Sequence, residues 1–313
     1  MRLAHVRCGT DLFPNLEASG VAGTRLSWPD PLCQGPLRRG PRSQWRHLRA
    51  DFLALSLGED LARMEALLDA EDAALDALEA DEICLWFEHD LYDQIILAHL
   101  VPRLADRARL SLVCLGAWPG VDRFVGLVQI PPTGLREAFD ARQRLGPEDV
   151  AAARLAWDAL TSPDPSAVER VRHDPTLARF AFLPDALHRW LEEFPAIGDG
   201  LGRTERQLLQ VLADGRRSFT SLFADVRACE ARPWLADTML HGLLWRLALE
   251  TIPLISIEDD DWLLTPVGRD VLRGDADRVF LNGCDADHGG VRLTGRSPGW
   301  RWNREHQRLD ALR

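Results

Sequence analysis

The sequence contains no lysine, and all 37 of its basic residues are arginine. Pyridoxal phosphate enzymes need a lysine for the Schiff base, and a P-loop needs one to reach the nucleotide phosphates. The ion-paired lysine of a protein-kinase site is missing as well. The sequence therefore excludes a pyridoxal phosphate site, a P-loop nucleotide site and a kinase-like site.

Cysteines are few and stand singly, at Cys8, Cys33, Cys84, Cys114, Cys229 and Cys284. None forms a Cys-x-x-Cys pair, and the histidine spacing completes no zinc knuckle. Because three of the cysteines lie in apolar, strand-like runs, we expect reduced thiols in the core and a cytoplasmic location. No apolar run approaches the ~18 residues that cross a bilayer, so we expect neither a membrane span nor a secretory signal.

Basic charge is also scarce, since the net charge is -11. Residues 1–200 carry a net charge of -10 and residues 201–313 a net charge of -1. An acidic body repels phosphate backbones, and neither part has the basic excess of a free-standing nucleic-acid-binding protein. The charge therefore makes DNA a less favoured partner than a small molecule or a protein.

What the sequence does contain is an alternation of strand and helix patterns over residues 1–130. Strands are predicted at residues 3–8, 24–28, 83–87 and 110–115. The run 83–87 is apolar throughout, which is typical of a strand covered on both faces. The pattern predicts an α/β domain with a mostly parallel, Rossmann-like sheet.

The remainder is predicted to be a helical segment over 131–199 and a winged-helix-like domain over 200–313. The glycine-rich stretch 198–202 separates the two. In the last part, three helices are expected before two strands with an acidic tip, at residues 204–213, 218–230, 235–249, 253–257 and 262–264. The tail is expected to form one more hairpin from 289–293 and 300–302.

Acidic residues follow three of the predicted strands. Asp11 follows the first, Asp30 the second, and Glu88-His89-Asp90 the third. Ligands of open α/β sheets bind beyond the carboxyl ends of the strands, so these side chains could face one crevice. We therefore predict a site there, with Asp11 and Asp30 contacting substrate.

The turn from Glu88 to Gln94 is the densest of these clusters. Carboxylates and imidazole are general acids and bases and ligands for divalent metals. We predict catalytic roles for Glu88, His89, Asp90, Tyr92 and Asp93, substrate contact through Gln94, and a divalent metal on His89, Asp90 and Asp93. The alternative is that Asp90 caps a helix, Asp93 favours its dipole and His89 satisfies a backbone carbonyl.

Two further segments have two interpretations each. The arginines of the loop 34–49, above all Arg38 and Arg42, could bind anionic substrate groups or could form a solvated basic face.

The third helix of the last domain would present Asp237, His241, Trp245 and Arg246. This is poor chemistry for a DNA groove, so a protein partner is the favoured use of the winged helix.

The motifs together resemble a bacterial family, the domain-of-unknown-function family 1835. The resemblance rests on Gly9-Thr10-Asp11, on Leu26 to Leu32 with Gly35-Pro36, and on Leu85 to Gln94, and it covers residues 1–120. Residues 189–209 and the tail with Gly289-Gly290 resemble the C-terminal part of longer members. The first turn departs from the family pattern, because its acid is displaced by one position. The resemblance implies the fold and the site and supplies no activity.

Two functions remain open from the sequence. The first is an enzyme, a metal-assisted hydrolase or transferase acting on a small phosphate- or amine-bearing substrate. The second is a regulator or adaptor that senses a ligand in the α/β part and binds a protein or DNA through the winged helix.

Overall fold

The computed structural model describes residues 1–312, which form two compact units. Of these residues, the first unit comprises 1–33, 65–159 and 170–187, and the second comprises 34–64, 160–169 and 188–312. The sequence predicted three consecutive segments, 1–130, 131–199 and 200–313. The chain instead passes several times between the units, so the loop after the second strand belongs to the second unit.

The first unit is built on a five-stranded sheet with the order β2-β1-β4-β5-β6. The strands are β1 (Leu3–Arg7), β2 (Thr24–Ser27), β4 (Glu82–Glu88), β5 (Arg109–Leu115) and β6 (Gln143–Leu145). The first four run parallel, and β6 pairs antiparallel with β5 at the edge. The predicted mostly parallel sheet is therefore confirmed.

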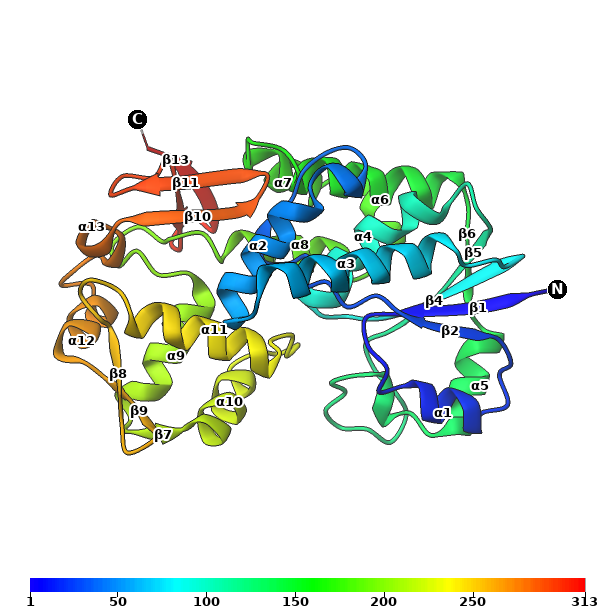
Figure 1. The fold of residues 1–313 in the computed structure, drawn as a ribbon, viewed down its shortest axis with the longest axis horizontal. Coiled ribbons are helices and arrows are strands. Elements are labelled where there is room, and N and C mark those ends of the chain that lie inside the picture. The colour runs from blue at the N-terminus through cyan, green and yellow to red at the C-terminus, as the bar shows by residue number, and fades with distance from the viewer. Residues whose placement is uncertain (313) are drawn as a thin grey trace. The chain divides into compact units, whose positions relative to one another are not determined.

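Helices cover both faces of this sheet. The helical elements of this unit are α1 (Phe13–Ala18), α3 (Leu61–Asp76), α4 (Leu91–Leu104), η2 (Leu127–Gln129), α5 (Pro132–Asp140), α6 (Pro147–Leu160) and η3 (Pro175–Arg179). Figure 1 shows α1 and α5 on one side of the strands and α4 and α6 on the other. On the α1 side, Trp86 and Val113 pack against Leu12 and Leu135. The double cover explains why residues 83–87 of β4 are all apolar.

The strand order creates one special position in this sheet. From β1 the chain turns to β2 on one side, and it later returns to β4 on the opposite side of β1. The crevice beyond the carboxyl ends of two such strands is where α/β sheets bind ligands. The ends of β1 and β4 are therefore where a site is expected.

The second unit contains a sheet formed by segments distant in the sequence. Its order is β11-β10-β3, and a separate hairpin joins β12 and β13. Gly35 and Pro36 of β3 pair with His288 and Gly289 of β10. The bounds are β3 (Gly35–Pro36), β10 (Cys284–Gly289), β11 (Val291–Gly295), β12 (Trp300–Asn303) and β13 (Arg308–Ala311). The predicted single tail hairpin is wrong, because each of its two strands pairs with a different partner.

In the rest of this unit three helices precede two strands, as predicted, and the structure adds strand β7 after the first helix and two helices after the strands. Its elements are α9 (Arg203–Ala213), β7 (Arg217–Ser218), α10 (Phe219–Ala228), α11 (Asp237–Ala248), β8 (Ile255–Glu258), β9 (Asp261–Leu264), α12 (Pro266–Arg273) and α13 (Arg278–Asn282). β7, β9 and β8 form a three-stranded sheet. η1 (Arg42–Gln44), α2 (Arg46–Leu57), α7 (Ser166–Val171) and α8 (Leu183–Leu191) complete the fold.

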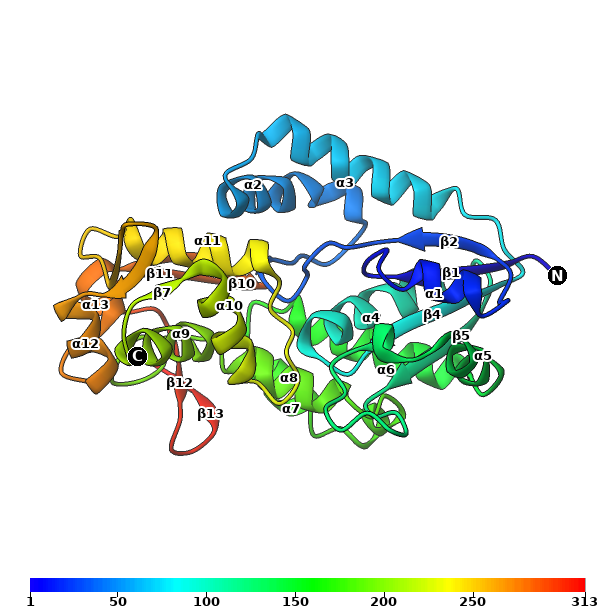
Figure 2. The same cartoon turned by 90° about the horizontal axis from the view of Figure 1, so that it is seen from below.

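Helix α2 lies beside α11 in both views (Figures 1 and 2). Gly242 of α11 makes this approach possible, because a Cβ there would lie 2.3 Å from the carbonyl oxygen of Ser56. One flank of α11 is therefore occupied by another helix of the same unit. Within residues 1–312, no helix has the length and apolarity required to cross a membrane.

Candidate functional site at the ends of strands β1 and β4

Arg7 and Glu88 end the two strands at the switch point, and their side chains lie on the same face of the sheet. Alternation along β1 places Arg7 above His5, and alternation along β4 places Glu88 above Trp86. The indole N–H of Trp86 donates a hydrogen bond to Nδ1 of His5 at 3.0 Å. This neutral, buried pair forms the floor beneath the two charged side chains.

The guanidinium of Arg7 lies at the centre of the site. Its side chain is only 4% exposed, and Nη2 lies 3.1 Å from Oδ1 of Asp11 and 3.7 Å from Oε1 of Glu88. Nε and Nη1 are also buried, and neither has a hydrogen-bond partner among residues 1–312. Because buried N–H donors are normally paired, the two open donors of Arg7 mark a place for an acceptor.

The carboxylate of Glu88 is positioned by the loop that follows β5. Its Oε1 accepts a hydrogen bond from the backbone N–H of Leu127 at 2.8 Å. Gly126 allows the close approach, because a Cβ there would lie 2.7 Å from Oε2 of Glu88. Burial, and then the charge of Asp93, raise the pKa of Glu88 to about 7. Glu88 can therefore take up or release a proton near neutral pH.

Asp93 and Asp90 hold the turn together. Oδ2 of Asp93 accepts a hydrogen bond from the backbone N–H of Glu88 at 2.5 Å, and burial raises the pKa of Asp93. Asp90 is the N-cap of α4, and its Oδ1 accepts from the N–H of Asp93 at 3.0 Å. The capping alternative accounts for these contacts of Asp90, and Asp93 lies in the first turn of the helix as that alternative expects. Catalytic roles for Asp90 and Asp93 stay predictions.

Cys8 follows Arg7 and hydrogen-bonds to Asp93. Burial, together with the charge of Asp93, raises the pKa of the Cys8 thiol well above its usual value. A thiol in this state stays protonated and is a poor nucleophile. Cys8 therefore contributes packing and polarity to the site and no thiolate.

His89 lies beside two aromatic rings. Its ring is buried beside Phe124 and Phe182, with 5.7 Å between the ring centroids in each case. Alternation past the end of β4 sends Glu88 and His89 in different directions, so the imidazole enters an aromatic environment. A catalytic role for His89 stays a prediction.

The metal set expected from the sequence does not form. Residues 1–312 contain no group of three His, Cys, Asp or Glu side chains arranged to hold a metal ion. His89 packs against aromatic rings, while Asp90 and Asp93 accept backbone hydrogen bonds. The prediction of a metal on His89, Asp90 and Asp93 is corrected accordingly.

Tyr92 and Gln94 make hydrogen bonds to backbone carbonyl oxygens near the turn. The hydroxyl of Tyr92 donates a hydrogen bond to the carbonyl oxygen of Pro29, and Asp30 is buried nearby. Nε2 of Gln94 donates to the carbonyl oxygen of Glu88 at 2.6 Å. These contacts fasten the loop after β2 and the start of α4 to the end of β4. Asp11, which is 55% exposed, is the predicted substrate-contact residue that reaches the Arg7–Glu88 pair.

Arg38 and Arg42 belong to the second unit. Nη2 of Arg38 bonds to Oδ1 of Asp287 at 2.9 Å, and its Nη1 donates to the carbonyl oxygen of Gly289 at 3.2 Å. The guanidinium of Arg42 lies 4.6 Å from the ring centroid of Trp45. Both arginines thus stabilise the fold of their own unit, and a role in substrate binding stays a prediction.

Sequence reasoning missed Arg7 and the backbone amide of Leu127. The sequence does contain a sign of the position of Arg7. Side chains two positions apart on a strand lie on the same face, so Arg7, at the end of a buried strand, lies on the same face as His5. No comparable signal exists for Leu127, since its contribution is a main-chain N–H.

No protein-family model matches the chain, and no curated protein matches it either. The resemblance of residues 1–120 to the domain-of-unknown-function family 1835 therefore stays a prediction.

Proposed function

We propose that the first unit is an enzyme that transfers a proton to or from a small substrate bearing a phosphate or carboxylate group. The observation that carries the proposal is the pairing at the switch point. Glu88, with a pKa of about 7, lies beside Arg7, which has two buried N–H donors without a partner in the described part of the chain. A carboxyl group that can exchange a proton and a guanidinium that can bind an anion therefore lie side by side.

Arg7 would bind the anionic group of the substrate. A guanidinium remains charged at every physiological pH, and its hydrogen bonds to anions are stronger than those between neutral groups. Asp11 and Glu88 already share Nη2, so the substrate would use Nε and Nη1. The side chain of Asp11 is partly exposed, so the anionic group would reach Arg7 from the solvent on the side of Asp11.

Glu88 would act as the general acid or base. In its ionised form it would accept a proton from water or from a substrate hydroxyl, and in its protonated form it would donate one to a leaving group. Both forms are populated near pH 7. Hydrolysis or transfer of a group next to the bound anion is the reaction class that these two residues support without a metal ligand set.

Anion binding by the intact protein tests the proposal. Inorganic phosphate and acetate are titrated into protein labelled with ¹⁵N arginine, and the Nε–H signals are followed by NMR. We expect one buried Nε–H signal, absent from Arg7→Lys, to shift with a saturable dependence on phosphate or acetate. Asp11→Asn should tighten binding because it removes a competing carboxylate, whereas Asp140→Asn, an exposed change on α5, should not. A buried Arg7 signal that neither anion moves would contradict the proposal.

For the second unit we propose a winged-helix domain that contacts a protein partner. The element order α9-β7-α10-α11-β8-β9 supports this assignment, since the third helix precedes a two-stranded wing. Helix α2 covers one flank of α11, and Asp237 and Trp245 lie on the exposed part. This surface suits a protein better than a nucleic acid. Binding to random duplex DNA at low salt should be absent, and an affinity falling steeply with added salt would favour DNA instead.

A further inference from the structure

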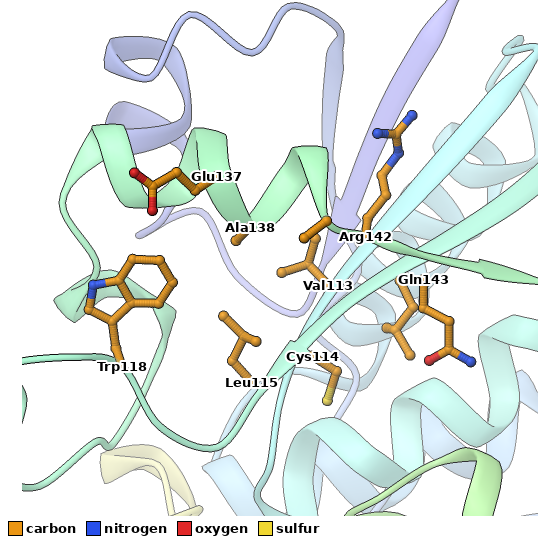
Figure 3. A pocket seen from close by; sticks show the side chains of 10 residues that line it. Val113, Cys114, Leu115, Trp118, Glu137, Ala138, Arg142 and Gln143 are labelled. Atoms are coloured by element: carbon orange, nitrogen blue, oxygen red, sulfur yellow. The ribbon is translucent and has the colours of Figure 1, made fainter.

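A cavity of about 380 Å³ opens beside strand β5 (Figure 3). It arises because β6 pairs with β5 only at Leu110, Ser111 and Leu112, while β5 continues to Leu115. The last residues of β5 therefore face α5 and the loop containing Trp118 across an open space. The volume lies within the range of small-molecule sites in proteins.

The walls of the cavity are mainly apolar. Val113 and Leu115 come from β5, and Ala138 comes from α5. Trp118 closes one end, and its indole lies against α5 because residue 134 is glycine: a Cβ there would lie 2.3 Å from Cζ2 of Trp118. The short side chain of Ala138 keeps the space open, so the cavity can accept a flat or chain-like apolar group.

The charge that faces the cavity is negative. Glu137 is exposed, and its carboxylate lies at the same end as Trp118 (Figure 3). Arg142 also lines the cavity, but Nε of Arg142 donates to Oε1 of Glu82 at 2.7 Å, and its guanidinium stacks 4.0 Å from the ring centroid of Phe139. Its charge is thus neutralised within the fold, so Glu137 supplies the charge available to a ligand. The indole of Trp118 and the carboxamide of Gln143 are neutral polar features of the lining.

We propose that this cavity binds a small organic ammonium ion with an apolar body. The apolar part would lie along Val113, Leu115 and Ala138. The ammonium would lie near the indole of Trp118 and the carboxylate of Glu137, a pairing that favours cations through the ring quadrupole and through charge. The site contains neither Arg7 nor Glu88, so it stands independently of the proposed function.

Three probes with the same ring separate charge from apolar burial. Protonated 2-phenylethylamine, 2-phenylethanol and 3-phenylpropionate are titrated into the full chain at pH 7 by isothermal calorimetry. We expect the ammonium to bind most tightly and the carboxylate at least about tenfold more weakly, as attraction to Glu137 becomes repulsion. Failure of the ammonium to bind, or equal affinity for the ammonium and the carboxylate, would overturn the proposal.

Variants locate the binding. Glu137→Gln should weaken the ammonium about fivefold, and Asp140→Asn on the same helix should leave its affinity unchanged. Ala141→Leu places a larger side chain at an exposed lining position and should reduce the affinity for both the ammonium and the alcohol. Unchanged thermal midpoints would show that the variants are folded. Equal effects of Glu137→Gln and Asp140→Asn, or no effect of Ala141→Leu, would place binding elsewhere and defeat the proposal.

Discussion

Oδ2 of Asp93, in the first turn of α4, accepts a hydrogen bond from the backbone N–H of Glu88 at 2.5 Å. The helix thereby ties back to the end of the strand that precedes it. The same arrangement places a second carboxylate close to Glu88, and burial together with that charge raises the pKa of Glu88. One contact thus serves both the fold of the turn and the chemistry proposed for it.

The raised pKa of Glu88 makes stability depend on pH. The pKa is about 7 in the folded protein and 4.5 for an ordinary glutamate, so the folded state holds more protons between these values. The free energy of unfolding therefore decreases as pH rises from about 4.5 to 7. Glu88→Gln cannot ionise, so it removes this decrease in the free energy of unfolding. We expect it to be up to about 3 kcal/mol more stable than the wild type at pH 8 and equally stable at pH 4, as measured by urea unfolding.

A matched control for this prediction is Glu137→Gln, which neutralises an exposed glutamate in the same unit. It should leave the pH dependence of unfolding as it is in the wild type. If Glu88→Gln were the less stable protein at pH 8, the ionised carboxylate would be a net stabilising group, and its proposed proton exchange near neutral pH would lose its basis.

Tyr92 is predicted to contribute to stability through its hydroxyl. That hydroxyl donates to the carbonyl oxygen of Pro29 in a buried setting, and burial raises the pKa of Tyr92 well above its usual value. Tyr92→Phe leaves the carbonyl unpaired and should lower the free energy of unfolding by about 1–2 kcal/mol. Phosphate binding should be unchanged in this variant. Loss of phosphate binding with unchanged stability would assign Tyr92 to the ligand instead.

Gly242 is predicted to be required for the contact between α2 and α11. Alanine normally stabilises a helix by about 1 kcal/mol relative to glycine. At position 242, however, the new Cβ would lie 2.3 Å from the carbonyl oxygen of Ser56. Gly242→Ala should therefore destabilise the protein by about 1–3 kcal/mol in chemical unfolding. Thr238→Ala, at an exposed position of the same helix, should be neutral or stabilising. A stabilised Gly242→Ala would show that the two helices are not in close contact.

The sequence predicts the parallel sheet well because its signal is local. The apolar run from Ile83 to Phe87 reflects burial on both faces, and the acids after it reflect a strand end that becomes a helix. The position of Glu88 at the sheet edge follows from the same pattern. The order of the strands is a matter of long-range pairing, and the sequence carries no direct sign of it.

Three further features could not be predicted, one for a local reason and two because they depend on long-range pairing. The direction of the His89 side chain depends on which residue after Glu88 begins the turn. The apolar pattern of the strand does not locate the start of a turn to a single residue. The pairing of Gly35 with His288 joins segments at opposite ends of the chain. Arg7 acquires its role only when β4 lies beside β1, since its partner Glu88 is far away in sequence.

The central claim is that the carboxyl group of Glu88 exchanges a proton near neutral pH beside Arg7. A ¹³C NMR titration of side-chain-labelled glutamate from pH 4 to 9, with Glu88→Gln identifying the signal, measures this directly. We predict a midpoint near pH 7, displaced when phosphate is bound. A Glu88 midpoint near 4.5, unmoved by phosphate, would contradict it.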